Sequence, residues 1–434
     1  MRKAVICRNR HPYRSAEAYL TAQVRGMCRD IICKPVCQAS MRLALKPPQV
    51  QRSCRSHIRE MNQPNSRLLR SWVSSMPFTL RATHRLLSTA STHSLYGCRI
   101  SHRALYEFKG RDVMKYLQGC MTKNVQSLEE CVMSQSFKQG QNAFYTSFLN
   151  PQGRVMADAF VHMIPTAQEP CVLIELDDTI SEDLITFLRR FKLRSKFQIN
   201  NVSSQWDVYQ VWGKGPLDMT VLHTQPASYA FKDIRTPDMG WRVVVPKGRA
   251  LPWKNVTTAP DADYAIHRIS QGVPEGARDI HMGSSLPLES CLDYMHGVDF
   301  HKGCYIGQEL TARTYFTGLV RKRIMPVSFS TEPPQLTRPL KIDTCTKIQL
   351  PDPDADVHLK EPGSLGSNET SKPSRSRSAG KFLSGIHNIG LAILRLEHVD
   401  KAQNGEAVHP NLVTEASDGT TLYLHAFRPS WWKQ

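Results

Sequence analysis

The sequence predicts an α+β protein that ends in a small all-β domain, and two observations carry this prediction. Between residues 96 and 319, strand-like apolar runs are mixed with amphipathic patterns of helical spacing, which favours a pair of α+β domains. From Val320 onward the pattern changes to short β-leaning runs separated by turns, as in a small barrel or a sandwich.

The elements of the first part follow in order along the chain. A short strand and then a helix are expected in YEFKGRDVMKYLQGC, where Asp112 suits the N-cap because its side chain can accept from a free backbone N–H. The Asn-Pro-Gln-Gly turn at 150–153 predicts that two strands meet in NAFYTSFLNPQGRVMADAFVHMI. Further expected elements are a buried strand from Cys171 to Leu176, a helix in DDTISEDLITFLRRFKL, strands in WDVYQVWG and WRVVVP, and a helix in DADYAIHRISQGV.

The second part contains four runs that are expected to be strands: VRKRIMPVSF, CTKIQL, GLAILRLEHV and TTLYLHAFRP. Residues 351–379 lie between the second and third runs and are rich in Pro, Gly, Ser and charge, which predicts a flexible insertion. The basic run Arg321, Lys322 and Arg323 at the start of the first strand is interpreted as a solvated edge.

Residues 1–95 differ from the rest of the chain in charge. They hold 17 Lys and Arg residues against three acids, so they carry +14 of the net charge of +18 and leave +4 for the remainder. The near balance of the remainder argues against a nucleic-acid-binding body, which the whole-chain charge would suggest. The leader is rich in Arg and Ser, and its basic amphipathic stretch 66–91 is typical of a mitochondrial transit segment, with a disordered basic tail as the alternative. Met41, Met61 and Met76 are candidate initiators of a shorter leader.

The lengths of the apolar runs and the spacing of the cysteines indicate the cellular compartment. The apolar runs are shorter than the roughly 18 residues that a membrane-spanning helix needs, so no membrane span is expected. Of the 12 cysteines, five lie in the leader, and the other seven are scattered with no C-x-x-C pair. This pattern lacks the spacing of a zinc site or a disulfide framework and fits a reducing compartment such as the mitochondrial matrix.

One cysteine stands in a distinctive context, DFHKGCYIGQEL. Cys304 has Lys302 as a neighbouring cation and Gly303 and Gly307 on either side, and a helix is expected to begin just after it. Cationic neighbours and helix N-termini favour the thiolate, which is the form that binds metals and attacks electrophiles. A small buried hydrophobic residue is the alternative role for Cys304.

A single cysteine cannot hold an iron–sulfur cluster, which typically needs four protein ligands. No other Cys or His forms an evident ligand set with Cys304, and His301 is interpreted as a solvated loop residue. If a cluster is involved, the remaining ligands are therefore expected from a second protein.

Carboxylates upstream of Cys304 form a second candidate constellation. Asp279 and Glu289 stand near the cations Arg268 and Arg278, and a carboxylate is a natural bidentate acceptor for the N–H edge of a pterin. A surface or capping acid is the alternative for Glu289. Asp158 lies in an expected strand, either as a general base that faces a cleft or as an outward polar residue.

Four segments resemble one family. The segments KGCYIGQELTAR (302–313), RISQGVPEGARDI with LPLE (268–289), AGKFLSGIHNIGLAILR (379–395) and GRDVMKYLQGCMTKNV (110–125) resemble the YgfZ-type proteins, which are folate-binding relatives of the glycine-cleavage aminomethyltransferase, or T-protein. The resemblance covers residues 96–434 apart from the insertion, and K-G-C-Y is its most specific motif. With its leader and the pair Trp431-Trp432, the chain is most similar to the mitochondrial members of the YgfZ branch, which act late in iron–sulfur cluster assembly.

The fold that this resemblance implies is a three-lobed, aminomethyltransferase-like (GcvT/YgfZ) arrangement around a folate-sized cleft. The expected parts are the leader (1–95), a discontinuous folate-binding-like domain with the K-G-C-Y motif (96–160 and 258–318), a second α+β domain (161–257), and a C-terminal β-barrel (319–434) that carries the insertion (351–379).

The resemblance also implies roles for individual residues. Glu289 matches the glutamate that holds the pterin in the T-protein branch, and Lys302 and Tyr305 are expected beside the cofactor. The T-protein branch has a Gly-Gly turn followed by an acidic pair, whereas this chain has Arg154 and Ala157 in place of one glycine and one acid, so that Asp158 alone remains. This departure argues against aminomethyl transfer. The motif residues to which the resemblance points are Lys302, Gly303, Cys304, Tyr305, Gly307, Gln308 and Glu309.

The function that the resemblance implies is assembly of iron–sulfur clusters for four-iron four-sulfur proteins in the mitochondrial matrix. Cys304 is expected to ligate a transient cluster shared with an A-type scaffold protein, with Lys302 lowering the thiol pKa and with Gln308 and Glu309 ordering the loop. Tetrahydrofolate is then either a working cofactor or an inherited binding capacity. The alternative is a folate-dependent one-carbon transferase that uses Asp158 and Glu289.

Overall fold

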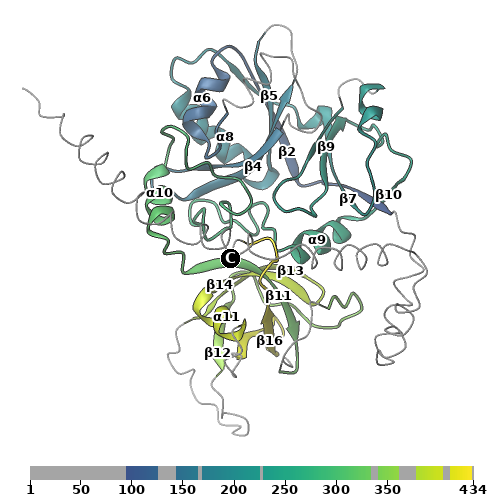
Figure 1. Ribbon diagram of the computed structural model, residues 1–434, viewed down its shortest axis with the longest axis vertical. Coiled ribbons are helices and arrows are strands. Elements are labelled where there is room, and N and C mark those ends of the chain that lie inside the picture. The colour runs from purple at the N-terminus through teal and green to yellow at the C-terminus, as the bar shows by residue number, and fades with distance from the viewer. Residues whose placement is uncertain are drawn as a thin grey trace, which may run out of the picture. The chain divides into compact units, whose positions relative to one another are not determined.

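The structure, a computed structural model, describes residues 94–125, 143–164, 169–224, 228–333, 341–360, 378–403 and 411–432. The expected leader lies outside the described residues apart from positions 94 and 95, and residues 361–377 of the expected insertion also lie outside them. Figure 1 shows the chain coloured from its N-terminus to its C-terminus.

Five antiparallel strands form the first sheet in the order β3-β4-β5-β2-β6. Their bounds are β2 Arg103–Lys109, β3 Ala143–Leu149, β4 Val155–Ile164, β5 Cys171–Asp177 and β6 Gln198–Asn201. Because side chains alternate between the faces of a strand, Val172, Ile174 and Leu176 point to one face, where α6 (Val113–Cys120) and α8 (Asp178–Lys192) cover them. Figure 1 shows both helices on this side of the sheet.

The two helices begin differently. Asp177 caps α8 as a helix N-cap should, because its carboxylate accepts from the backbone N–H of Thr179 at 2.9 Å. Asp112 occupies the N-cap position of α6 without a capping bond, and its carboxylate instead accepts from the backbone N–H of Lys196 at 2.6 Å. Asp112, the expected cap of α6, therefore holds the segment before β6 in place.

The second sheet has the order β10-β1-β7-β9-β8. Its strands are β1 Leu95–Arg99, β7 Trp206–Gly213, β8 Tyr229–Lys232, β9 Trp241–Pro246 and β10 Val256–Thr258. The pair of β1 and β10 is parallel, and the other pairs are antiparallel. The short helical turns η1 (Ser203–Gln205) and η2 (Met219–Thr224) lie before and after β7.

The sheets are followed by α9 (Asp261–Ser270), a long irregular segment, and α10 (Gln308–Thr317). Both α9 and α10 stand where the sequence predicts helices. Gly307 and Gly318 flank α10 in left-handed conformations that glycine adopts without steric cost. No helix in the described parts of the chain is long and apolar enough to cross a membrane.

The C-terminal part is a closed barrel, in the order β11-β14-β13-β12-β15-β16. Its elements are β11 Lys322–Ser330, β12 Asp356–Lys360, β13 Gly380–Ile386, β14 Ile389–Arg395, α11 Leu396–Gln403, β15 Asn411–Glu415 and β16 Thr421–Ala426. The predicted barrel is thus confirmed, but residues 345–350 form no strand. The position of the strand expected there is occupied by β12, which lies inside the expected insertion and pairs with β13 and β15.

The expected domain limit at residues 160 and 161 falls inside β4. Val161 pairs with Phe144 on β3 and with Ile174 on β5, so one continuous ladder runs across this position. In the structure, strands of the first sheet extend to β6, and the second sheet joins β1 to strands that follow residue 205.

The inner faces of the two sheets contribute to one hydrophobic core. Leu105 and Leu173 of the first sheet and Val208 and Val244 of the second belong to the same buried cluster. By strand alternation, the polar residues of these inner faces also point into the interior. This places charged side chains in the interior between the two sheets.

Candidate functional site

Cys304 lies in a loop before α10, and its side chain is exposed. The Lys302 ammonium Nζ donates to the carbonyl oxygens of Gln118, Met121 and Lys123 at 2.7, 2.7 and 3.1 Å. An ammonium has three donors, so these bonds use them all. Burial lowers the pKa of Lys302 to about 8, although the three acceptors favour the protonated form. The lysine therefore anchors the loop to the end of α6, and no contact supports the prediction that it activates the thiol.

Two glycines fix the other side of the loop. Gly307 has φ +78°, and a Cβ there would meet the carbonyl oxygen of Asn150 and lie 2.9 Å from Cβ of Leu149. Gly153 has φ +79°, and a Cβ there would lie 2.8 Å from Cβ of Leu310. The turn between β3 and β4 thus packs directly against the start of α10, because both positions lack a side chain.

The remaining motif residues order the loop or face solvent. Gln308 closes the loop on Tyr305 by two hydrogen bonds. Its side-chain Oε1 accepts from the Tyr305 backbone N–H at 3.1 Å, and its backbone N–H donates to the Tyr305 carbonyl at 3.3 Å. Lys302 Nζ lies 4.9 Å from the centroid of the Tyr305 ring, and burial raises the pKa of Tyr305 to about 12. Glu309 is exposed, and a Cβ at Gly303 would meet nothing within 4 Å.

Helix α10 presents an exposed apolar face next to this loop. Thr311 is its buried residue, whereas Tyr315, Phe316 and, just beyond the helix, Leu319 are 43%, 74% and 66% exposed. The Phe300 ring stacks on Tyr315 with centroids 3.6 Å apart. This contact joins the residues before Cys304 to the end of α10, so the thiol and the apolar face belong to one ordered segment. Sequence reasoning missed this face, although the run of apolar residues in TYFTGL was a usable signal.

The other described cysteines divide by burial. Cys98, Cys120, Cys171 and Cys291 are buried, and burial raises the pKa of each thiol, to about 11 for Cys120 and about 12 for the other three. These thiols stay protonated and are poor metal ligands. Cys345 is exposed like Cys304, but it lies in the segment 341–350, which contains no strand or helix.

Glu289 lines a small pocket between the LPLE segment and α10. The pocket has a volume of about 170 Å³ and is otherwise lined mainly by apolar residues, and burial raises the pKa of the Glu289 carboxyl. Lys302 and Tyr305 do not line it. Pockets for drug-sized ligands measure about 300–1,000 Å³, and the three donors of Lys302 are already used. These three residues therefore do not fit tetrahydrofolate as one site.

Asp158 is buried on the inner face of β4. Its carboxylate accepts from the Tyr145 hydroxyl at 3.2 Å and from the Gly276 N–H at 3.1 Å. Burial raises the pKa of Asp158, and Arg103 opposes this shift. The side chain thus neither points outward nor stands exposed in a cleft, and its geometry supports a structural role.

A buried network of ionic side chains lies between the two sheets. Glu175 of β5 pairs with Arg103 of β2 at 2.8 Å and with Arg242 of β9 at 2.9 Å. Glu275 pairs with Arg242 at 3.0 Å and with Arg235 at 2.6 Å. The network therefore links the first sheet, the second sheet and the irregular segment after α9.

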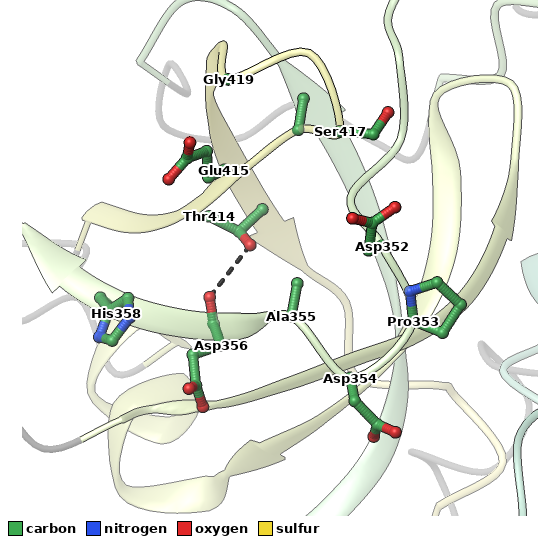
Figure 2. Close-up of a pocket in the computed structure, with 11 residues that line it drawn as sticks. Asp352, Pro353, Asp354, Ala355, Asp356, His358, Thr414, Glu415, Ser417 and Gly419 are labelled. Atoms are coloured by element: carbon green, nitrogen blue, oxygen red, sulfur yellow. Dashed lines mark hydrogen bonds between the residues drawn. The ribbon is translucent and has the colours of Figure 1, made fainter.

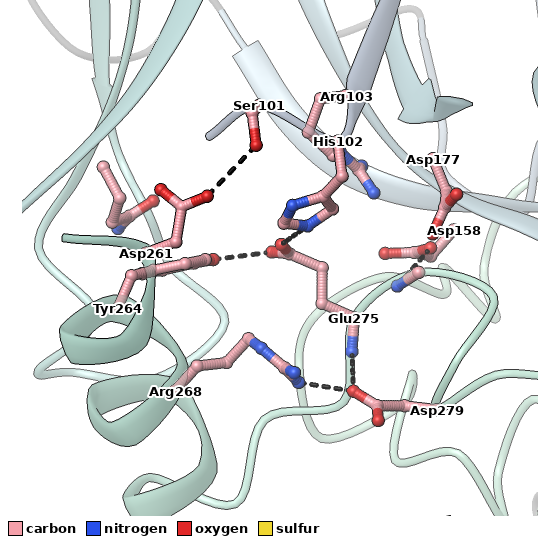
Figure 3. Close-up of polar contacts among 12 residues, drawn as sticks. Ser101, His102, Arg103, Asp158, Asp177, Asp261, Tyr264, Arg268, Glu275 and Asp279 are labelled. Carbon is pink, nitrogen blue, oxygen red and sulfur yellow. Dashed lines mark hydrogen bonds and ion pairs between the residues drawn. The ribbon is translucent and has the colours of Figure 1, made fainter. Parts of the chain in front are cut away.

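Figure 3 shows part of this network, with Glu275 between His102 and Tyr264. Burial raises the pKa of Glu175, but Arg242 and Arg103 outweigh it and lower that pKa to about 2. Sequence reasoning missed these residues, although Glu175 in CVLIEL and Arg242 in WRVVVP are single charges inside apolar runs. A buried charge of this kind needs a partner, which was the available signal.

Asp279 and its neighbours join this interior to the barrel. Asp279 is buried, forms an ion pair with Arg268, and accepts from the Glu275 N–H at 2.9 Å and from the Ser384 hydroxyl on β13. Arg278 is exposed. The two carboxylates grouped in the sequence analysis are thus in different surroundings, because Asp279 is buried between α9 and the barrel while Glu289 lines a pocket.

Comparisons with known proteins identify the family of this chain. The family described as CAF17, C-terminal β-barrel domain, matches residues 321–434. The mitochondrial iron–sulfur cluster assembly factor IBA57 homolog of Mycosarcoma maydis is 40% identical over 361 residues, which cover 79% of this chain and 86% of the relative. The chain belongs to the IBA57 family of mitochondrial iron–sulfur cluster assembly factors.

Further IBA57 homologs lie at greater distance. The one from Neurospora crassa is 35% identical over 315 residues, covering 69% of each chain, and the one from Dictyostelium discoideum is 30% identical over 366 residues, covering 69% of this chain and 86% of the relative. The glycine cleavage system aminomethyltransferase T of Bartonella henselae shares the fold, with a TM-score of 0.52 at 14% identity over 79% of this chain and 88% of that structure. The predicted aminomethyltransferase-like fold is thereby confirmed.

The barrel of this IBA57-family chain carries an acidic surface pocket of about 500 Å³. Figure 2 shows Asp352, Asp354, Asp356 and Glu415 around it, with the Thr414 hydroxyl bonded to the Asp356 carbonyl at 3.0 Å. No residue predicted for the site lies there. Among the described residues, no group of three or more His, Cys, Asp and Glu side chains has the arrangement of a metal site.

The basic run at the start of the barrel differs from the expectation of a solvated edge. Arg321 is exposed, but Arg323 is buried, pairs with Asp293 at 2.8 Å and lies 3.8 Å from the centroid of the Tyr294 ring. Trp432 is buried against the same tyrosine, with centroids 5.7 Å apart. Arg323 is thus a core residue where the barrel meets the preceding segment.

Proposed function

We propose that this chain supplies Cys304 as one thiolate ligand of an iron–sulfur cluster that it holds jointly with an A-type scaffold protein in the mitochondrial matrix. The cluster is cargo destined for four-iron four-sulfur proteins. One cysteine supplies one of the four protein ligands that such a cluster typically needs, so the partner contributes the rest.

The observation that carries this proposal is the placement of the Cys304 thiol. It is exposed on a loop that Lys302 and Gly307 fasten from both sides, whereas the buried thiols have raised pKa values. An exposed thiol can lose its proton to solvent and meet a metal ion carried by another protein. Membership of a family named for cluster assembly supports the same reading.

The apolar face of α10 supports docking of a partner at this loop. Tyr315, Phe316 and Leu319 are exposed, and aromatic residues are enriched in the cores of protein–protein interfaces. A partner that covers them places its own ligands beside Cys304. The proposal takes no step through tetrahydrofolate, because Glu289, Lys302 and Tyr305 do not fit it as one site.

Anaerobic mixing of the full chain with a cluster-loaded A-type scaffold tests the role of Cys304. We expect wild type to elute with the scaffold and with the visible absorbance of the cluster, and Cys304→Ser to lose this complex. Cys345→Ser is the matched control, since Cys345 is the other exposed cysteine among the described residues. A cluster-bearing complex that forms equally well with Cys304→Ser contradicts the proposal.

A second variant separates docking from ligation. The double substitution Phe316→Ser and Leu319→Ser removes apolar contact area but keeps the thiol, and we expect affinity for the scaffold to fall at least about tenfold. Ile342→Ser is the control, because Ile342 is an exposed apolar residue outside α10. Equal affinities for all three proteins would show that the partner docks elsewhere.

A further inference from the structure

A basic groove lies far along the chain from Cys304, between the end of β2 and the segment that follows α8. It has a volume of about 560 Å³. Its lining includes four cations, one acid, the exposed Leu193 and the buried Phe197; the charged residues are Lys109, Lys192, Arg194, Lys196 and Glu169. The groove is thus strongly cationic.

The charge is concentrated by the sequence itself. The run RRFKLRSK (189–196) holds five cations in eight residues and no acid, whereas residues 96–434 together carry a net charge of only +4. Arg189, Arg190, Arg194 and Lys196 are exposed. None of these four side chains forms an ion pair with a carboxylate of another described residue.

Helix electrostatics account for only part of this cluster. Cations in the last turn of a helix are favourable because of the negative end of the helix dipole, which explains Arg189, Arg190 and Lys192. Arg194 and Lys196 follow the helix, and Lys109 comes from β2. Their gathering in one groove therefore calls for an external anionic partner.

Leu193 lies in the middle of the cations and projects into solvent. It is 87% exposed, and its backbone has φ 44°, a conformation that leucine rarely adopts. Lysine is depleted in the cores of protein–protein interfaces, which are built from several apolar or aromatic residues. A single leucine surrounded by Lys and Arg instead matches surfaces that attach to anionic bilayers, where the cations meet the headgroups and the apolar side chain enters the acyl boundary.

We propose that this groove docks the chain on an anionic phospholipid surface, with phosphate headgroups among Lys109, Arg194 and Lys196 and with Leu193 inserted between lipids. This attachment is peripheral and reversible. It does not depend on Cys304 or on the apolar face of α10, so it stands apart from the proposed function.

Vesicle cosedimentation of the full chain tests the proposal. The vesicles are phosphatidylcholine with or without phosphatidylglycerol, and the leader is the same in every variant, so its own charge cancels in the comparison. We expect Arg194→Glu with Lys196→Glu to weaken binding to anionic vesicles at least about tenfold, and Leu193→Ser to weaken it about fivefold. Lys254→Glu with Lys347→Glu is the matched control, because both lysines are exposed and lie outside the groove.

Circular dichroism of each variant checks that the fold is retained. Equal weakening by the groove variant and the control would overturn the proposal, since charge alone would then explain the binding. Groove-dependent binding to neutral vesicles, or preferential groove-dependent binding of RNA or of the A-type scaffold over anionic vesicles, would overturn it as well.

Discussion

At the scale of single residues, the two glycines of the Cys304 loop have different tasks. Gly307 adopts a left-handed conformation against the turn at Gly153, whereas Gly303 faces open space. The sequence indicates that both glycines permit sharp turns, but it cannot distinguish them. That distinction depends on Asn150, which is more than 150 residues away along the chain and becomes a neighbour only in the folded protein.

We expect Gly307→Ala to destabilise the protein by about 1–3 kcal/mol, because its Cβ meets backbone atoms and the left-handed conformation is unfavourable for alanine. Gly303→Ala is the control and should change stability by less than about 0.5 kcal/mol. Urea unfolding of the two variants measures this difference. Similar midpoints for both variants would show that the loop is not packed as described.

Lys302 illustrates what the sequence could not reveal at this scale. The motif suggested a cation placed for the thiol, and the structure shows an ammonium bound by three backbone carbonyls around the end of α6. Backbone acceptors leave no mark in a sequence, because every residue carries one. The prediction that Cys304 ligates a shared cluster needs no such information, because it depends on the K-G-C-Y motif.

At the scale of elements, the long amphipathic or apolar segments were predictable and the irregular ones were not. The buried strand from Cys171, helix α8 and helix α9 all stand where their patterns place them. Strand β12 was hidden because its neighbours in sequence are rich in Pro, Gly and charge, and only pairing with β13 and β15 makes it a strand. Tertiary context outweighed local composition there.

The C-terminal segment gives a prediction at this scale. Trp432 is buried with Tyr294 and lies 5.9 Å from the Arg323 guanidinium, so Trp432→Ala should destabilise the protein by about 3–5 kcal/mol. Trp431→Phe is the control, since it loses mainly the bond from the indole N–H to the Gln271 carbonyl, worth about 1 kcal/mol. Thermal unfolding of both variants gives the comparison, and a smaller loss for Trp432→Ala than for Trp431→Phe would contradict the described packing.

At the scale of the whole molecule, buried charges hold the two sheets together. Glu175 belongs to the first sheet and Arg242 to the second, and Glu175 also contacts Arg103 and His162 of its own sheet. The isolated charges in apolar strands are visible in the sequence, but their pairing is not, because the partners come from strands far apart in the chain. The folded pKa of Glu175, about 2, lies below its ordinary value of 4.5.

This shift predicts acid sensitivity. The unfolded chain binds a proton at Glu175 more readily than the folded one, so the stabilisation is fully present above about pH 4.5 and is lost as the pH falls towards 2, by roughly 3 kcal/mol in all. Glu175→Gln should cost about 3–5 kcal/mol at neutral pH, because the buried Arg103 loses its carboxylate partner and the buried Arg242 keeps only Glu275, and it should flatten the pH dependence. Glu332→Gln, at an exposed position, is the control. Free energies of unfolding measured at intervals of about one pH unit between pH 2 and 7 check the sign of this dependence. Equal pH dependence in both variants would refute the prediction.

The fastening of the Cys304 loop has a consequence for the docking of a partner that we propose there. A loop that became ordered only on contact would lose conformational entropy with each association, about 0.5–1.5 kcal/mol for each immobilised side chain. The contacts of Lys302 and Gly307 order this loop when the protein folds, so the entropy is lost before a partner binds. A partner that binds there therefore meets a preorganised thiol. Repeated association and dissociation then cost no further conformational entropy of this loop.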